Sequence, residues 1–150
     1  MLKINGLILI FIIFLNTSIV LAGDISAIDI SNLWISEAPP TVSVLVGYVT
    51  LKNKSKKTES LISVSSPLFS SIEIHRSIVK DDVASMERYS SLIIPAKSTI
   101  KLLPGDYHLM LFNPKTPLEI GDMPTLTFTF SSGIKIPVKA YVKKRKYNEH

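Results

Sequence analysis

The segment Ser71-Ile-Glu-Ile-His-Arg-Ser-Ile78 alternates polar and apolar residues and is rich in β-branched side chains, a pattern typical of a strand. A second strand is predicted over Val83 to Tyr89, after the polar turn signal Lys80-Asp81-Asp82. If this hairpin closes symmetrically between Lys80 and Asp81, residue 75 faces residue 86. His75 and Met86 would then project from one face, with β-carbons roughly 4.5–5.5 Å apart.

A further strand-like run, Asp106-Tyr-His-Leu-Met-Leu-Phe112, carries a second pair of the same kind. Residues two apart on a strand share a face, so His108 and Met110 project together. Taken singly, each of the four residues has an ordinary explanation, because methionine often fills cores and histidine is often a structural hydrogen-bonding residue. Together, two imidazoles and two thioethers form a soft, neutral ligand set that suits Cu(I) better than a hard cation.

The spacing His75-x10-Met86-x21-His108-x-Met110 resembles the copper motif of the PCuAC-type periplasmic copper chaperones. The flanking sequence is similar too, as in Leu103-Pro104-Gly105 and Pro117-Leu118-x-x-Gly121-Asp122. The resemblance extends from Ile28 to Val142. It implies that the four residues bind Cu(I) and that the protein delivers copper. The implied recipient is the CuA site of cytochrome c oxidase subunit II, with a Sco-type assembly protein as a further partner.

The rest of the chain also consists of short strand patterns separated by turn signals, with no amphipathic helix. This arrangement predicts an all-β fold, an antiparallel β-sandwich of the cupredoxin-like or immunoglobulin-like Greek-key type. The charged segment from Lys52 to Thr58 is expected to be a solvated hairpin loop, and Ile134 to Val142 the last strand. We find no internal repeat, so residues 23–142 are predicted to form one copper-binding β-sandwich domain.

Residues 1–22 are predicted to be a secretory signal peptide. Lys3 supplies a positive n-region, Leu7 to Leu15 an apolar run, and Val20-Leu21-Ala22 a cleavage site after Ala22. An uncleaved membrane anchor is the alternative, but Asn16-Thr17-Ser18 interrupts the apolar run, and a span needs about 20 apolar residues. The expected location is the periplasm, with no stable membrane span after cleavage.

Composition excludes several classes of function. The chain contains no cysteine, so it has neither a disulfide framework nor the thiolate that a blue-copper electron carrier requires. Its formal net charge is +5, without a basic patch interleaved with aromatic residues, so we expect no nucleic-acid partner. Residues 143–150 are expected to be a basic C-terminal tail. We find no catalytic motif in the sequence, so we do not expect the protein to be an enzyme. The competing hypothesis is a metal-free exported β-sandwich interaction module.

Several charged residues near the motif have two possible roles. Glu73 and Asp106 each lie two positions before a histidine, where a carboxylate can orient an imidazole. A solvent-facing carboxylate is the simpler explanation for both. Arg76 would disfavour a cation if it pointed toward the site. Met123 lies outside the motif and is expected to serve in packing.

Overall fold

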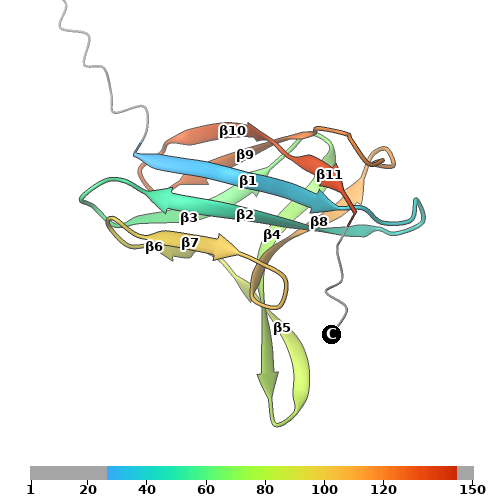
Figure 1. Cartoon of the computed structure of the whole chain (residues 1–150), viewed down its shortest axis with the longest axis horizontal. Helices are drawn as coiled ribbons and strands as arrows, with labels where there is room; N and C mark the ends of the chain where they lie inside the picture. The colour runs from blue at the N-terminus through green and yellow to red at the C-terminus, as the bar shows by residue number, and fades with distance from the viewer. Residues whose placement is uncertain (1–26, 145–150) are drawn as a thin grey trace, which may run out of the picture.

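The computed structural model describes residues 27–144, which form two β-sheets packed face to face (Figure 1). The larger sheet has the strand order β11-β1-β2-β8-β4-β5, and β7 also pairs with β2. Its members are β1 (Ile28–Ser36), β2 (Val44–Asn53), β4 (Phe69–Lys80), β5 (Val83–Tyr89), β7 (Thr99–Leu102), β8 (Tyr107–Pro114) and β11 (Tyr141–Lys143). The predicted all-β sandwich is confirmed; all strand pairs are antiparallel except β1 with β11.

The smaller sheet has the order β10-β9-β3-β6 and covers one face of the larger sheet. Its strands are β3 (Glu59–Ser65), β6 (Leu92–Ile94), β9 (Thr125–Phe130) and β10 (Lys135–Lys139). In β9 the side chains of Leu126, Phe128 and Phe130 are fully buried, while the intervening threonines are not. This alternation is what a strand with one face on the core requires.

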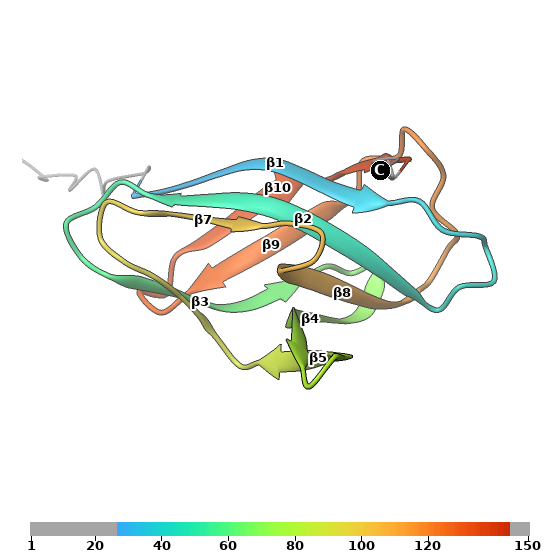
Figure 2. The same ribbon diagram turned by 60° about the horizontal axis from the view of Figure 1, so that its bottom comes forward.

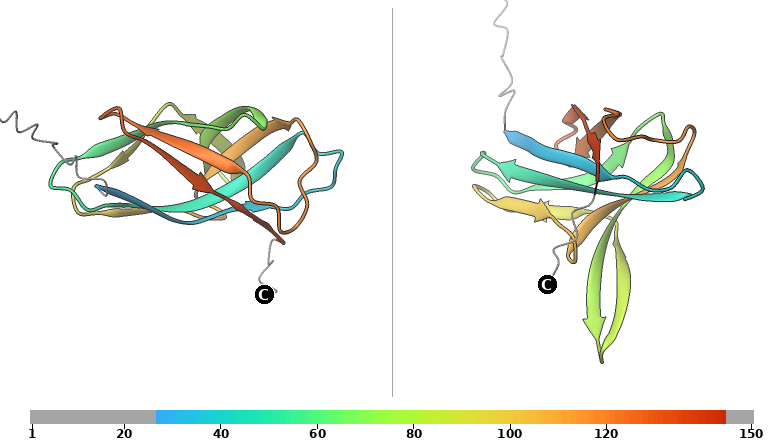
Figure 3. Two further views of the ribbon diagram at one scale, coloured as in Figure 1. Left: turned by 90° about the horizontal axis from the view of Figure 1, so that it is seen from above. Right: turned by 45° about the vertical axis from the view of Figure 1, so that its right-hand side comes forward.

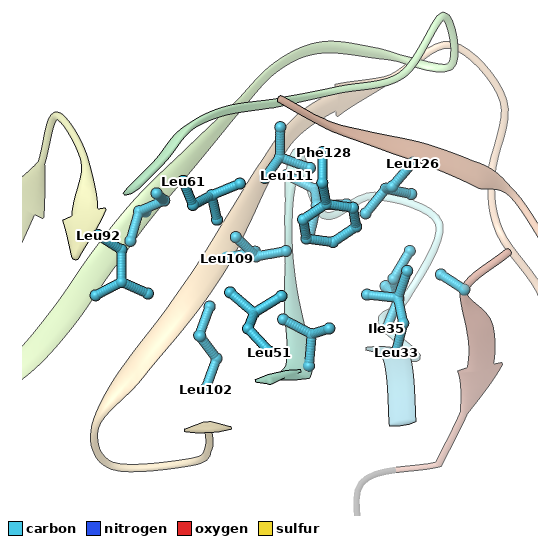
Figure 4. Packing of buried hydrophobic residues seen from close by; sticks show 14 of the residues in the cluster. Leu33, Ile35, Leu51, Leu61, Leu92, Leu102, Leu109, Leu111, Leu126 and Phe128 are labelled. Carbon is cyan, nitrogen blue, oxygen red and sulfur yellow. The ribbon is translucent and has the colours of Figure 1, made fainter. Parts of the chain in front are cut away.

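The core lies between the two sheets and consists of aliphatic and phenylalanine side chains. Figure 4 shows Leu51, Leu109 and Leu111 from the larger sheet meeting Leu61 and Phe128 from the smaller one, and all five are fully buried. Burying one such side chain stabilises the fold by about 1.5–3 kcal/mol. Because β8 contributes Leu109 and Leu111 to this core, its position is fixed, and Met110 between them faces the other way.

Two expectations about the connections are wrong. The loop from Lys52 to Thr58 is not a hairpin loop, because β2 and β3 belong to different sheets. The segment instead connects the two sheets, and buried Asn53 stabilises this connection. Its Nδ2 donates hydrogen bonds to the carbonyl oxygens of Lys57 (2.8 Å) and Ile94 (3.0 Å). The last predicted strand is two strands, since β10 pairs with β9 and β11 pairs with β1, with buried Ala140 at the change of sheet.

The β4–β5 hairpin extends beyond the sandwich. Pairing of β4 with β8 ends at Arg76 and Tyr107, but β4 continues to Lys80 with only β5 beside it. Figure 2 shows the two strands together at the lower edge, and Figure 3 (right) shows them projecting away from both sheets. The start of this projection is where His75 lies.

The predicted signal peptide lies outside the described residues, as does the predicted tail beyond Lys144. Within the described part of the chain, no helix is long and apolar enough to cross a bilayer.

Candidate metal centre

His75 and His108 lie directly opposite each other on β4 and β8. Their ring centroids are 6.2 Å apart, and the ring planes are inclined by 32°. The next pair on the same face is Glu73 with Met110, because residues two apart on a strand share a face. The alternating residues Ile74 and Leu109 point into the core. The two imidazoles and one of the two thioethers therefore project together from the face turned away from the core.

Met86 is on the same face, but not at the predicted position. Ser77 faces Met86, whereas His75 faces Arg88, so the hairpin register differs by two residues from symmetric closure between Lys80 and Asp81. An even shift keeps every side chain on its original face. Met86 is consequently a diagonal neighbour of His75, a relation in which residues lie about 7–8 Å apart and remain within reach of long side chains.

The turn explains this register. Asp81 and Asp82 both have positive φ, 50° and 60°, and they form a two-residue loop between Lys80 and Val83. Two-residue hairpins of type I′ need positive φ at both central positions. Aspartate tolerates this conformation better than lysine does, because its short polar side chain bonds the local backbone. The two aspartates therefore occupy the loop, and Lys80 remains in the strand.

Each imidazole uses one nitrogen for a hydrogen bond. His75 Nε2 lies 2.8 Å from Glu73 Oε2, and His108 Nδ1 lies 2.9 Å from the carbonyl oxygen of Asp106. The other two nitrogens, His75 Nδ1 and His108 Nε2, each expose less than 1 Å² and have no hydrogen-bond partner among the described residues.

Leaving a buried polar atom without a partner costs about 1–3 kcal/mol, and few such atoms occur in native proteins. Two of them on directly opposed residues are the arrangement expected where an external group accepts both lone pairs. Within residues 27–144, no three His, Cys, Asp or Glu side chains are grouped as a metal site. The neighbouring thioethers on this face are those of Met110 and Met86, and they are soft donors that could complete a metal site between His75 and His108.

The methionines differ in their surroundings. Met110, in the middle of the sheet, is partly buried, whereas Met86 on the projecting hairpin is 61% exposed. His108 is 3% exposed. The two residues of the group on β8 are therefore largely shielded from solvent, whereas Met86 on β5 is accessible to solvent.

Arg76 does not point toward the imidazoles. It faces Tyr107, one position along from the histidine pair, and therefore lies on the opposite face of the sheet. Its Nε donates to Asp106 Oδ1 at 2.9 Å, and its guanidinium lies 4.8 Å from the centroid of the Tyr107 ring. The hydrogen bond to Asp106 raises the pKa of the Arg76 guanidinium above its ordinary value. This cation is therefore kept away from the histidines.

The two carboxylates before the histidines have different roles. Glu73 contacts the His75 ring, as an orienting carboxylate would. The carboxylate of Asp106 is bonded to Arg76, and it is the backbone carbonyl of Asp106 that accepts from His108. That carbonyl also accepts from the backbone N–H of Ser77 at 3.2 Å, which ties the start of β8 to β4 beside the site.

Sequence reasoning missed Arg88. Its Nη1 lies 3.4 Å from Glu73 Oε1, and its side chain is 68% exposed. The alternation of β5 carried the signal, since Arg88 is two residues after Met86 and must share its face. Met123 is 47% exposed and lies between β8 and β9, outside the motif strands.

Comparison with known proteins places the chain in a family. Residues 28–142 match the family model described as "Putative lipoprotein LpqE-like". The chain belongs to this LpqE-like family, which is of the PCuAC type. A putative lipoprotein of Leifsonia xyli subsp. xyli is 34% identical over 117 residues, which are 77% of this chain and 69% of that protein. An uncharacterized protein of Rickettsia prowazekii is 34% identical over 84 residues, 55% of this chain and 46% of that protein.

Solved structures agree with this assignment. The apo PCuAC domain from PmoF1 superposes with a TM-score of 0.68 at 20% identity, covering 81% of this chain and 98% of that domain. The CuI form of DR1885 from Deinococcus radiodurans gives a TM-score of 0.63 at 29% identity, covering 78% of each chain. The predicted cupredoxin-like β fold is therefore confirmed. In this LpqE-like chain, the four motif residues come from three neighbouring strands of one sheet and share one face.

Proposed function

We propose that this protein is an exported Cu(I)-binding chaperone that carries the ion between His75, His108, Met110 and Met86. The observation that carries the proposal is the pair of buried, unpartnered nitrogens, His75 Nδ1 and His108 Nε2, on directly opposed residues. Each of these nitrogens, when it carries no proton, has a lone pair that a soft cation can accept. Copper here is the cargo of the protein and not a cofactor of a reaction.

The donor set explains the choice of metal. Two neutral imidazoles and two thioethers contribute no negative charge, so the ion keeps its +1 charge and gains polarizable ligands. Mg²⁺ and Ca²⁺ require oxygen ligands, and structural zinc sites usually recruit thiolates or several histidines. The same set suits transfer, because a neutral thioether on an exposed strand is a ligand that an incoming donor can replace. Met86, at 61% exposure, is the ligand most accessible for that exchange.

The names of the solved relatives support this proposal. One is a copper-bound PCuAC domain from PmoF2, and another is the CuI form of DR1885, which is 29% identical to this chain. The putative-lipoprotein description of the family and of the Leifsonia relative supports export, in agreement with the signal peptide predicted over residues 1–22. We propose the periplasm as the location of the exported protein.

The recipient is proposed from the family resemblance. We infer delivery to the CuA site of cytochrome c oxidase subunit II, with a Sco-type assembly protein as partner. Mixing the Cu(I)-loaded protein with a soluble, metal-free CuA domain and then adding a one-electron oxidant such as ferricyanide should develop the mixed-valence copper absorption of that domain. The absence of transfer would restrict the proposal to copper binding.

The alternative function is a metal-free interaction module. It gives no reason for burying two unpaired imidazole nitrogens on facing residues, with a methionine on each side of them. No contact among the described residues compensates for those two nitrogens.

A competition titration with Cu(I) and a chromophoric chelator tests the function. The wild-type protein should withdraw one equivalent of copper from the chelator, and the double variant Met86→Leu/Met110→Leu should lose most of that ability. Met123→Leu is the matched control, because Met123 is also exposed but lies outside the site. Equal competition by all three proteins, or by none of them, would refute a copper site built from these thioethers.

A further inference from the structure

Glu73 forms two contacts that the copper proposal does not use. Its Oε2 lies 2.8 Å from His75 Nε2, and its Oε1 lies 3.4 Å from Arg88 Nη1. Glu73 is 22% exposed, and His75 is 14% exposed. Since His75 and Arg88 are directly opposed on β4 and β5, the carboxylate bridges the two strands beside the imidazole.

The hydrogen bond determines which nitrogen of His75 carries the proton. An ionised carboxylate only accepts hydrogen bonds, and an arginine only donates them. With one carboxylate oxygen facing Arg88, the other can bond to His75 only if Nε2 carries a hydrogen. In the neutral ring the lone pair then lies on Nδ1, the buried nitrogen without a partner.

His108 is held in the opposite tautomer by a different device. A backbone carbonyl oxygen also only accepts, so the bond to Asp106 places the proton of His108 on Nδ1 and the lone pair on Nε2. The main chain supplies this acceptor, and no side-chain substitution at Asp106 removes it. The corresponding acceptor for His75 is a side chain and can be removed.

We propose that Glu73, braced by Arg88, is the positioning residue that fixes the tautomer and orientation of His75 and thereby presents Nδ1 to the copper ion. This inference rests on the proposed function, because it assumes that His75 is a ligand. The consequence is an asymmetric pair, in which His75 binds through Nδ1 and His108 through Nε2. Removing an acceptor of this kind typically lowers metal affinity 10–100-fold.

The first measurement is a long-range 1H–15N NMR spectrum of the imidazoles in the metal-free protein at neutral pH. Wild type should show His75 as the Nε2–H tautomer and His108 as the Nδ1–H tautomer. In Glu73→Ala, His75 should lose its single-tautomer signature while His108 keeps its own. This result does not depend on copper binding, so it separates a failure of this inference from a failure of the proposed function.

The second measurement is Cu(I) affinity in the same competition assay. Glu73→Ala should bind copper 10–100-fold more weakly, and Glu73→Asp should be similarly impaired, because it keeps the charge but withdraws the carboxylate from the ring. Arg88→Ala should give a smaller loss. The control is Glu87→Ala, since Glu87 lies on the same hairpin but on the opposite face and contacts Tyr89.

Circular dichroism identifies any variant that does not fold, and Glu73→Asp is the least disruptive of the set. Wild-type affinity in both Glu73 variants, or an unchanged His75 tautomer in Glu73→Ala, would overturn the positioning role. Full affinity in Glu73→Asp alone would also overturn it, because the carboxylate would then act through its charge and not through its contact with the ring.

Discussion

At the scale of single residues, the two methionines of the site are chemically alike and structurally different. Met110 is partly buried between core positions of β8, and Met86 is largely exposed on β5. Leucine has nearly the volume of methionine but no sulfur, so a Met-to-Leu change removes the donor and keeps the packing. The two positions should therefore separate copper binding from folding.

Met110→Leu should change the free energy of unfolding by less than about 1.5 kcal/mol, as expected for a volume-conserving swap. Met86→Leu should change it by no more than about 0.5 kcal/mol, as expected at an exposed position. Each single variant should nevertheless bind Cu(I) more weakly than wild type. Urea denaturation and the copper competition assay measure the two quantities on the same samples, and a single variant with unchanged copper affinity would exclude its methionine from the site.

At the scale of elements, the β4–β5 hairpin determines where Met86 lies relative to the histidines. Its register depends on Asp81 and Asp82, whose positive φ values make the two-residue turn. A β-branched residue in this conformation is disfavoured by roughly 1–2 kcal/mol, whereas Asp-Gly is a preferred sequence for the turn. The turn is exposed, so its substitution tests the element without altering any proposed ligand.

Asp82→Val should increase amide hydrogen exchange in β5 by about 5–30-fold, which corresponds to 1–2 kcal/mol, and should weaken Cu(I) binding. Asp82→Gly should slow exchange or leave it unchanged and keep copper affinity. Exchange measured by NMR on the metal-free protein gives the first quantity. If Asp82→Val increased exchange in β5 but left Cu(I) affinity unchanged, the ordered hairpin would not be required for copper binding by Met86.

The hairpin also shows what the sequence could predict. Alternation placed His75, Met86, His108 and Met110 on strands, and the parity of their spacing placed them on shared faces. The predicted register was wrong because Lys80-Asp81-Asp82 allows two different two-residue turns. Which turn forms depends on which of these residues tolerate positive φ. Arg88 was missed for another reason: the alternation of β5 placed it on the face of the site, but Glu73 was considered only as a partner of His75. The carbonyl of Asp106 was missed because residue patterns indicate side-chain positions and not which main-chain atoms those side chains contact.

At the scale of the whole molecule, the sandwich holds β4 and β8 through core residues such as Ile74 and Leu109, and the opposite faces of these strands carry the imidazoles. The fold class follows from strand patterns, but the division of residues 134–142 into β10 and β11 does not. That change of sheet depends on where Ala140 meets the core, a tertiary contact that local alternation does not encode.

Copper should stabilise the folded protein as a whole, because the four proposed ligands converge only in the native state. A ligand that binds only the folded state stabilises it by about 2.7 kcal/mol when its free concentration is 100 times its Kd. We expect a clear rise in Tm on adding Cu(I) under reducing conditions. The Met86→Leu/Met110→Leu variant should show little or no rise, and an equal rise in that variant would indicate copper bound elsewhere.

X-ray absorption spectroscopy of the Cu(I)-loaded protein tests the central claim most directly. Two ring nitrogens and two thioether sulfurs around one copper ion should produce both nitrogen and sulfur scattering in the first coordination shell, and the Met86→Leu/Met110→Leu variant should lose the sulfur contribution. A wild-type spectrum that contains only nitrogen and oxygen scatterers would contradict a copper site built from His75, Met86, His108 and Met110.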